Sequence, residues 1–212
     1  AAAVYPIDKS VPPHIAAFAE ILSCIASGAR KVAVQPGESV VVLGAGPAGL
    51  LFTQIAKAAG AGKLIVVETS PFRRRFALES GADLAVDPRE VDVKGLVLDE
   101  TKGGADVVID AVGSLFGTAL PLARRQGKIL LFGMDQTSTT PVRQVDITRN
   151  ELQVIGSYIA DFTFPAAIRM IESGVLQLEK LITHRYGVHE LRKGLDALSR
   201  REAIKVIIDP TL

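Results

Sequence analysis

A glycine-rich turn joins a predicted strand to a predicted helix early in the chain. The strand is the apolar run 39–43 (Ser-Val-Val-Val-Leu), and the turn is 44–49 (Gly-Ala-Gly-Pro-Ala-Gly). In this pattern the first glycine permits a sharp turn, the second leaves room for a ligand at the backbone, and the third lets the helix pack closely on the sheet. The free N–H groups at such a helix start bind a diphosphate. We therefore predict that a dinucleotide binds at Gly44, Gly46, Pro47, Ala48 and Gly49.

A second predicted strand, 63–67, ends directly before an acidic residue. Glu68 lies about twenty positions beyond Gly49, the spacing at which an acid binds the adenosine ribose hydroxyls. A carboxylate at this place repels a 2′-phosphate, so NAD is favoured over NADP. The arginines at 73–75 weaken this preference; a solvated helix face is expected for at least two of them, whereas Arg73 can cover the adenine. The further predicted cofactor contacts are Glu68, Thr69 and Arg73.

Strand-like and helix-like segments alternate along the chain, which predicts an α/β fold with a doubly wound parallel sheet. Further strands are predicted at 83–86, 106–110, 128–132 and 151–158, and helices at 12–26, 49–59, 71–80, 90–101 and 114–123. The polar segment 135–145 is predicted to be loop or edge structure. After Tyr158 the pattern changes to helix 164–173, strand 181–183, helix 188–200 and strand 204–208, which indicates a different layer.

The composition excludes several classes of protein. Lys and Arg number 24 against 23 Asp and Glu, so the chain lacks the excess positive charge with which nucleic-acid-binding proteins neutralise phosphate. The single cysteine, Cys24, excludes an internal disulfide, and with three histidines it leaves little material for a metal site built by this chain alone. Neither a membrane-spanning apolar run nor a secretory signal is found, so a cytoplasmic location is predicted.

Further motifs follow in order along the chain. They are 20–23 (Glu-Ile-Leu-Ser), 36–40 (Pro-Gly-Glu-Ser-Val), 81–83 (Gly-Ala-Asp), 104–113 (Gly-Ala-Asp-Val-Val-Ile-Asp-Ala-Val-Gly), 127–134 (Gly-Lys-Ile-Leu-Leu-Phe-Gly-Met), 181–186 (Leu-Ile-Thr-His-Arg-Tyr) and 203–208 (Ala-Ile-Lys-Val-Ile-Ile). With the glycine-rich turn, the chain resembles the zinc-type medium-chain dehydrogenase/reductase superfamily, and within it the sorbitol and related polyol dehydrogenases. The resemblance implies a Rossmann dinucleotide-binding domain at 21–155. It also implies a small remnant of a GroES-like catalytic domain, formed by 1–20 and 156–212.

The resemblance also implies cofactor contacts and an assembly. Val112 and Gly113 would border the cofactor, and Phe132, Gly133 and Met134 would present backbone to the nicotinamide ring. The alternative is that both segments are ordinary turns at strand ends. The strand near Val154 would lie at the sheet edge and pair with a second copy, giving a homodimer or homotetramer, because an exposed strand edge needs cover. No nucleic-acid or membrane partner is expected.

Glu20 is the one acidic side chain in the apolar segment 15–26. An unpaired carboxylate in apolar surroundings is costly, so Glu20 should be ion-paired, protonated, exposed or bound to metal. In zinc polyol dehydrogenases a glutamate at this place lies at the catalytic zinc, which makes Glu20 the predicted metal residue and a structural ion pair the alternative. The other zinc ligands and the catalytic residues are expected in an N-terminal domain that this chain lacks, so no catalytic residue is assigned.

The activity implied by the resemblance is hydride transfer between NAD and an alcohol or polyol, or the matching ketone, with zinc acting as a Lewis acid. This chain would supply the coenzyme-binding part and be inactive alone. Ile159 stands where sorbitol dehydrogenases carry an arginine, which argues against sorbitol itself. The alternatives are a zinc-free quinone or enoyl reductase of the same superfamily, a nucleotide-binding fragment without catalysis, and an FAD-binding protein. The last is disfavoured because the chain has no Gly-Asp pair.

Overall fold

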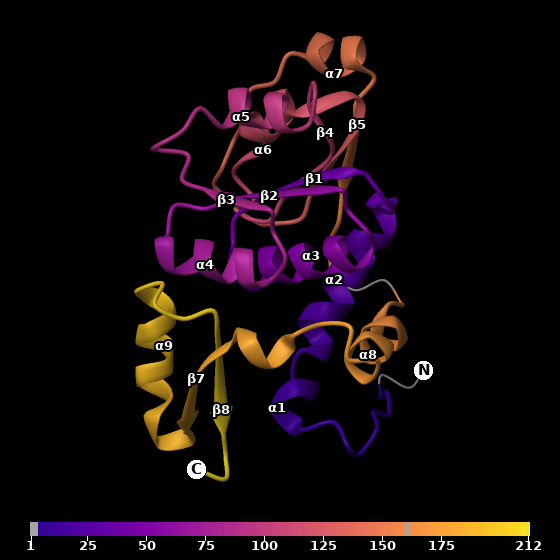
Figure 1. Ribbon diagram of the computed structural model, residues 1–212. Coiled ribbons are helices and arrows are strands. Elements are labelled where there is room, and N and C mark those ends of the chain that lie inside the picture. Colours follow the sequence, from indigo (N-terminus) through magenta and orange to yellow (C-terminus); the bar gives the residue numbers. More distant parts are fainter. Residues whose placement is uncertain (1–3, 160–161) are drawn as a thin grey trace.

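The computed structural model describes residues 4–159 and 162–212 and is built around a six-stranded parallel sheet (Figure 1). In their spatial order the strands are β3 (Leu84–Val86), β2 (Lys63–Val67), β1 (Ser39–Leu43), β4 (Ala105–Asp110), β5 (Ala123–Leu131) and β6 (Gln153–Gly156). All neighbouring pairs are parallel. The chain builds outward from β1 to β3, returns beside β1 and then builds the other half, which is the doubly wound arrangement. The predicted α/β fold class is therefore confirmed.

Helices cover both faces of this sheet (Figure 1). One face carries α2 (Ala19–Val32), α3 (Pro47–Ala58) and α4 (Pro71–Glu79). The other carries α5 (Val93–Glu100), α6 (Phe116–Ala119) with the 3₁₀ turn Leu120–Leu122, and α7 (Gln144–Asn150). Within the described ranges, no helix is long and apolar enough to span a lipid bilayer.

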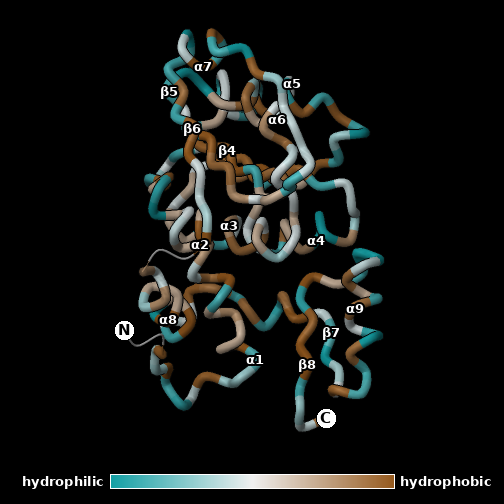
Figure 2. The backbone as a smooth tube through the Cα atoms, turned by 180° about the vertical axis from the view of Figure 1, so that it is seen from behind, coloured by the Kyte–Doolittle hydropathy of each residue, from teal (hydrophilic) through white to brown (hydrophobic). Residues whose placement is uncertain are grey.

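The apolar core is divided between the two faces by the alternation of side chains along the strands. Val40 and Val42 of β1 pack in one cluster with α2, α3 and α4, whereas Val41 and Leu43 pack in a second cluster with α5 and α6. All of β1 is buried, and Figure 2 shows the central strands in the brown of apolar residues. A strand buried on both faces has no polar alternation, which is why continuous apolar runs predicted β1 and β2 correctly.

The remaining segments form a second layer beside α2, α3 and α4 (Figure 1). There β7 (Ile182–Gly187) and β8 (Lys205–Asp209) form a separate parallel sheet that carries α9 (Leu191–Ser199), with 3₁₀ turns at Leu178–Leu181 and Val188–Glu190. α8 (Phe164–Glu172) contacts both α1 (Pro13–Ala16) and α2. The pattern change predicted after Tyr158 thus corresponds to a separate sheet. The division into domains at 20/21 and 155/156 stays a prediction, and its first boundary falls inside α2.

Three predicted elements were wrong in part. Segment 12–26 is not one helix, because Ala17 and Phe18 have ψ angles of −12° and −13°, flatter than in an α-helix, and separate α1 from α2. The segment predicted as loop at 135–145 runs into α7, which has too few apolar residues to show a helical period. The helix predicted at 114–123 is shorter than expected: α6 ends at Ala119, the 3₁₀ turn Leu120–Leu122 with Pro121 follows it, and β5 begins at Ala123.

Candidate functional site

The glycine-rich turn lies where β1 meets α3, at the carboxyl ends of the strands. Gly44 has φ +95°, a left-handed conformation that favours glycine, and its N–H donates to the Val67 carbonyl at 2.8 Å. A Cβ on Gly49 would lie 1.9 Å from the Gly44 carbonyl oxygen. α3 begins at Pro47, where a missing N–H breaks no helical bond. The turn therefore has the tight bend and the close helix packing that a dinucleotide-binding motif requires.

Glu68 follows β2 and directs its carboxylate toward this turn. Its Oε2 accepts a hydrogen bond from the Ala45 N–H at 2.9 Å. Its Oε1 accepts from the Ser70 N–H at 2.9 Å and from the Thr69 hydroxyl at 3.2 Å. Because a carboxylate offers about four acceptor sites, these bonds hold Glu68 in place and leave capacity for the hydroxyls of a ligand.

The three arginines at the start of α4 lie in different environments. Arg74 is bound to Asp87 through Nη1 at 2.8 Å. Arg73 extends toward the glycine-rich turn, with Nη1 3.9 Å from the position that a Cβ on Gly46 would take, and its buried Nε has no hydrogen-bond partner among the described residues. Of the three, Arg75 alone is exposed. The expectation of at least two solvated arginines was therefore wrong.

Asp87 follows β3 and is only 3% exposed. Besides Arg74, it binds Arg89, which donates through Nε at 2.9 Å and Nη2 at 2.6 Å. Both arginines also donate to the Thr69 carbonyl, so this cluster fixes the loop that carries Glu68. Hydrogen bonds from Arg89 and Arg74 hold the pKa of the Asp87 carboxyl far below its usual range.

We expect acid to weaken the fold through Asp87. Its pKa is lower in the folded than in the unfolded chain, where a value of about 3.9 applies. The unfolded chain therefore takes up the proton first, and the stability that Asp87 provides above about pH 4 is lost as the pH falls. Urea unfolding at about pH 3 to 7 should show that Asp87→Asn is less stable than wild type near neutrality and that the difference narrows in acid. A difference that does not change with pH would contradict this role.

Asp110, at the end of β4, organises the neighbouring loop. This carboxylate is 2% exposed. Its Oδ1 accepts from the N–H groups of Val112 and Gly113 at 2.9 and 2.8 Å, and its Oδ2 accepts from the Leu115 N–H at 2.9 Å. Sequence analysis did not single out this residue. The available signal was an acidic residue placed at the end of a buried apolar strand.

The loops after β4 and β5 pack backbone against backbone. A Cβ on Gly113 would lie 2.5 Å from the Gly133 carbonyl carbon, and a Cβ on Gly133 would lie 2.2 Å from the Val112 carbonyl carbon. The N–H groups of Phe132 and Gly133 donate to the Asp110 carbonyl at 3.0 and 2.9 Å. Gly113 and Gly133 therefore permit a close approach of two loops that a larger residue would separate.

Two cavities at the carboxyl ends of the strands contain most of the predicted contacts. The Glu68 cavity, of about 320 Å³, is lined by Gly44, Glu68, Thr69, Arg73 and Val112 and also by Arg201, which sequence analysis missed. The Phe132 cavity, of about 570 Å³, is lined by Phe132, Gly133 and Met134 together with Tyr158 and Ile159. Gly46, Pro47 and Gly49 belong to the turn itself, and Ala48 packs against the core. In doubly wound sheets this is the edge where ligands bind.

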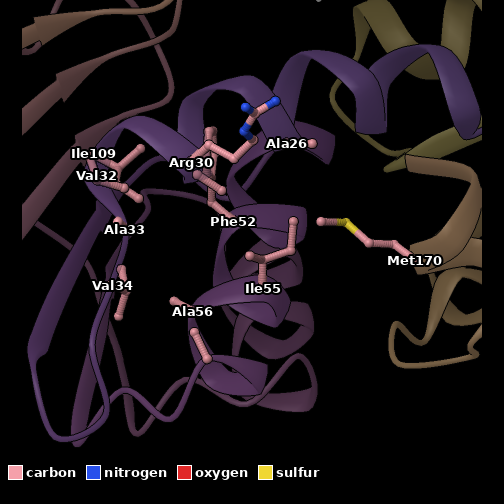
Figure 3. Close-up of a pocket in the computed structure, with 12 residues that line it drawn as sticks. Ala26, Arg30, Val32, Ala33, Val34, Phe52, Ile55, Ala56, Ile109 and Met170 are labelled. Atoms are coloured by element: carbon pink, nitrogen blue, oxygen red, sulfur yellow. The ribbon is translucent and has the colours of Figure 1, made fainter. Parts of the chain in front are cut away.

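A third cavity, of about 220 Å³, lies between α2 and α3 (Figure 3). Apolar side chains such as Phe52 and Ile55 form its walls, and Arg30 and Met170 lie at its edge. Its lining includes no carboxylate, thiol or imidazole among the described residues. This cavity therefore offers packing space and no groups for chemistry.

Glu20, the predicted metal residue, lies exposed in the first turn of α2. Its Oε1 is 3.8 Å from the Cys24 Sγ, and burial together with the Glu20 charge raises the pKa of the Cys24 thiol. The structural ion pair considered as the alternative for Glu20 is not found among the described residues. Within the same residues no group of three metal-ligating side chains is present, so they do not form a zinc site by themselves.

A sheet of this strand order, with a glycine-rich turn after its first strand and an acid after its second, defines a dinucleotide-binding fold. Comparison with known proteins narrows this class. The family model described as zinc-binding dehydrogenase matches residues 47–173, more than half of the chain, and the protein belongs to this family.

Individual relatives agree with this assignment. An erythritol/L-threitol dehydrogenase of Mycolicibacterium smegmatis is 34% identical over 213 residues, covering 99% of this chain and 59% of that protein. A zinc-binding dehydrogenase structure from Clostridium scindens superposes with a TM-score of 0.91 at 26% identity, covering 98% of this chain and 60% of that one. Another from Sinorhizobium meliloti, with NADP bound, has a TM-score of 0.87 at 29% identity and covers 97% and 62%. The chain thus spans about 60% of the length of these relatives.

Proposed function

We propose that the protein binds NAD and supplies the coenzyme-binding part of a zinc-type alcohol or polyol dehydrogenase. Such an enzyme transfers a hydride between the cofactor and an alcohol, a polyol or the matching ketone, while the protein fixes the nicotinamide against the substrate. The observation that carries this proposal is the placement of Glu68 beside the glycine-rich turn, within one cavity. The polyol substrate class is supported by the erythritol/L-threitol dehydrogenase relative.

The two cavities indicate which part of the cofactor each segment of the chain would contact. The adenosine ribose would bind at Glu68 and the diphosphate at the start of α3, where no side chain of the described residues caps the backbone N–H groups. The nicotinamide would lie against Phe132, Gly133 and Met134, with Val112 and Gly113 at the intervening loop. The Asp110 contacts hold that loop in place before the cofactor arrives, which lowers the entropic cost of binding.

Glu20 is the residue through which this chain would contribute to a zinc site. A catalytic zinc takes three protein ligands, and the described residues bring no such group together. We therefore expect this chain alone to bind cofactor without oxidising alcohols, and we place the remaining ligands in the part of the relatives that the chain does not span. A nucleotide-binding module without catalysis is the second candidate function. It is favoured by the same observation, that the described residues bring no set of zinc ligands together.

Assembly through the sheet edge is part of the proposal. β6 is the last strand of the sheet, and Val154 on it is 37% exposed. An open strand edge is readily covered by a second copy of the same strand. Homodimers or homotetramers are therefore expected, and sedimentation of the purified chain measures their size.

Titration with reduced cofactors tests the proposed function. We expect the wild-type chain to bind NADH roughly tenfold more tightly than NADPH, because the Glu68 carboxylate accepts ribose hydroxyls and repels a 2′-phosphate. Glu68→Gln should bind NADH less tightly and lose most of this preference. Nicotinamide fluorescence gives both dissociation constants. Absence of NADH binding to the folded wild-type chain, or flavin absorbance in the purified protein, would refute the proposal.

A further inference from the structure

Arg201 reaches the Glu68 cavity from the other layer of the molecule. It lies between α9 and β8, in the segment that follows the six-stranded sheet, yet it lines the same cavity as Glu68 and Arg73. In Figures 1 and 2 the end of α9 lies close to α4, which brings this turn toward the carboxyl ends of the strands.

The backbone at Arg201 has a conformation in which glycine is usually found. Its φ is +59°, its N–H donates to the Leu198 carbonyl at 3.0 Å, and the Glu202 N–H donates to the Ala197 carbonyl at 3.0 Å. This pattern is the Schellman motif that ends many helices, and its left-handed residue is most often glycine. Arginine costs stability there, and such a conformation is a reason to look for a function.

The charges around the cavity favour an anionic ligand. Its charged lining consists of Glu68, Arg73 and Arg201. The Glu68 carboxylate already accepts three hydrogen bonds from its own loop and from the glycine-rich turn. By contrast, neither arginine forms an ion pair with any carboxylate in the described part of the chain, and the Arg73 Nε is buried without a partner. Guanidinium groups bind phosphate through paired N–H donors, so two of them in one cavity suit a phosphate group.

We propose that Arg201 is a phosphate-binding residue of the cofactor site and acts together with Arg73. This inference rests on the proposed function and adds that the second layer holds the adenosine half of the cofactor directly. The bound group is a phosphate of the diphosphate, because the proposed cofactor NAD carries no 2′-phosphate. Binding would then connect the turn after α9 to the βα loops of the sheet.

Replacing Arg201 with glycine separates this role from a structural one. Glycine accepts the left-handed backbone, so Arg201→Gly should be at least as stable as wild type in thermal unfolding. The matched control is Arg200→Ala, which removes the same charge from the neighbouring position outside the cavity lining. Calorimetric titration with adenosine, AMP, ADP and adenosine 2′,5′-bisphosphate, at low and high salt, provides the readout.

We expect Arg201→Gly to bind a phosphate-bearing probe about tenfold more weakly than wild type or Arg200→Ala, with adenosine unchanged and with a weaker dependence on salt. A loss of affinity of Arg201→Gly for ADP identifies the diphosphate as the group that Arg201 binds. A loss of affinity confined to the bisphosphate would place a 2′-phosphate at Arg201 and contradict both the assigned diphosphate contact and the proposed preference for NAD. Equal affinities of Arg201→Gly and Arg200→Ala for every phosphate probe would overturn the role of Arg201 while leaving the proposed function intact. Failure of wild type to bind any of the four probes or NADH would overturn both.

Discussion

Gly49→Ala is expected to destabilise the protein and to weaken cofactor binding at the same time. The added methyl group would lie 1.9 Å from the Gly44 carbonyl oxygen and 2.9 Å from its carbon, and both atoms belong to the backbone of a tight turn. No rotation of a side chain relieves this overlap, so α3 has to move away from the turn. Overpacking of this kind costs about 3 kcal/mol, which lowers the midpoint of thermal unfolding by roughly 6–12 °C in a protein of this size.

Measuring NADH affinity of the Gly49→Ala variant tests whether the displaced helix start also binds the cofactor. Because the start of α3 supplies the N–H groups for the diphosphate, its displacement should weaken NADH binding by about tenfold or more. The control for stability is Gly156→Ala, since a Cβ at Gly156 would meet no atom within 4 Å. That substitution should change the free energy of unfolding by no more than about 0.5 kcal/mol. Equal stability of the two variants would show that the turn and α3 are not held at the distance described above.

Asp110→Ala is expected to have a comparable effect through lost hydrogen bonds. The substitution leaves the N–H groups of Val112, Gly113 and Leu115 without their acceptor, next to a carboxylate position that is almost fully buried. Unsatisfied buried N–H donors, together with the lost hydrogen bonds to a charged acceptor, lower the free energy of unfolding by about 3 kcal/mol or more. Chemical unfolding measures this loss, and NADH titration should show weaker binding because the loop after β4 loses its order.

Two comparison variants make the Asp110 result interpretable. Asp110→Asn keeps the shape and one acceptor oxygen, so its loss of stability should be intermediate. Asp99→Ala removes an exposed carboxylate whose side chain makes no hydrogen bond to any described residue, and it should leave stability and NADH affinity close to those of wild type. If Asp110→Ala behaves like Asp99→Ala, the carboxylate does not organise the loop.

Much of the fold followed from local patterns in the chain. The buried strands β1, β2 and β4 are short continuous runs of branched apolar residues, and the helices α3 and α4 begin with proline and end near glycine, so each carries its own signal. α7 carried no such signal, because it is mostly polar, with Ile147 as its contact with the apolar core. The break between α1 and α2 was missed for the opposite reason, since the apolar residues continue through it.

The glycine-rich turn and Glu68 were identifiable because their spacing along the chain reflects a local βαβ unit, whose geometry depends on few other residues. The loop contacts of Asp110 are also local, and its place at the end of a buried strand was their signal. The partners of Arg74 and the presence of Arg201 beside Glu68 had no counterpart in the linear pattern. The pair of Arg74 with Asp87 forms only when β2 and β3 lie side by side in the sheet, and Arg201 reaches the cavity only when the second layer has packed against the sheet. Local spacing therefore specified the turn that receives a dinucleotide, whereas long-range packing decided which charged side chains surround it.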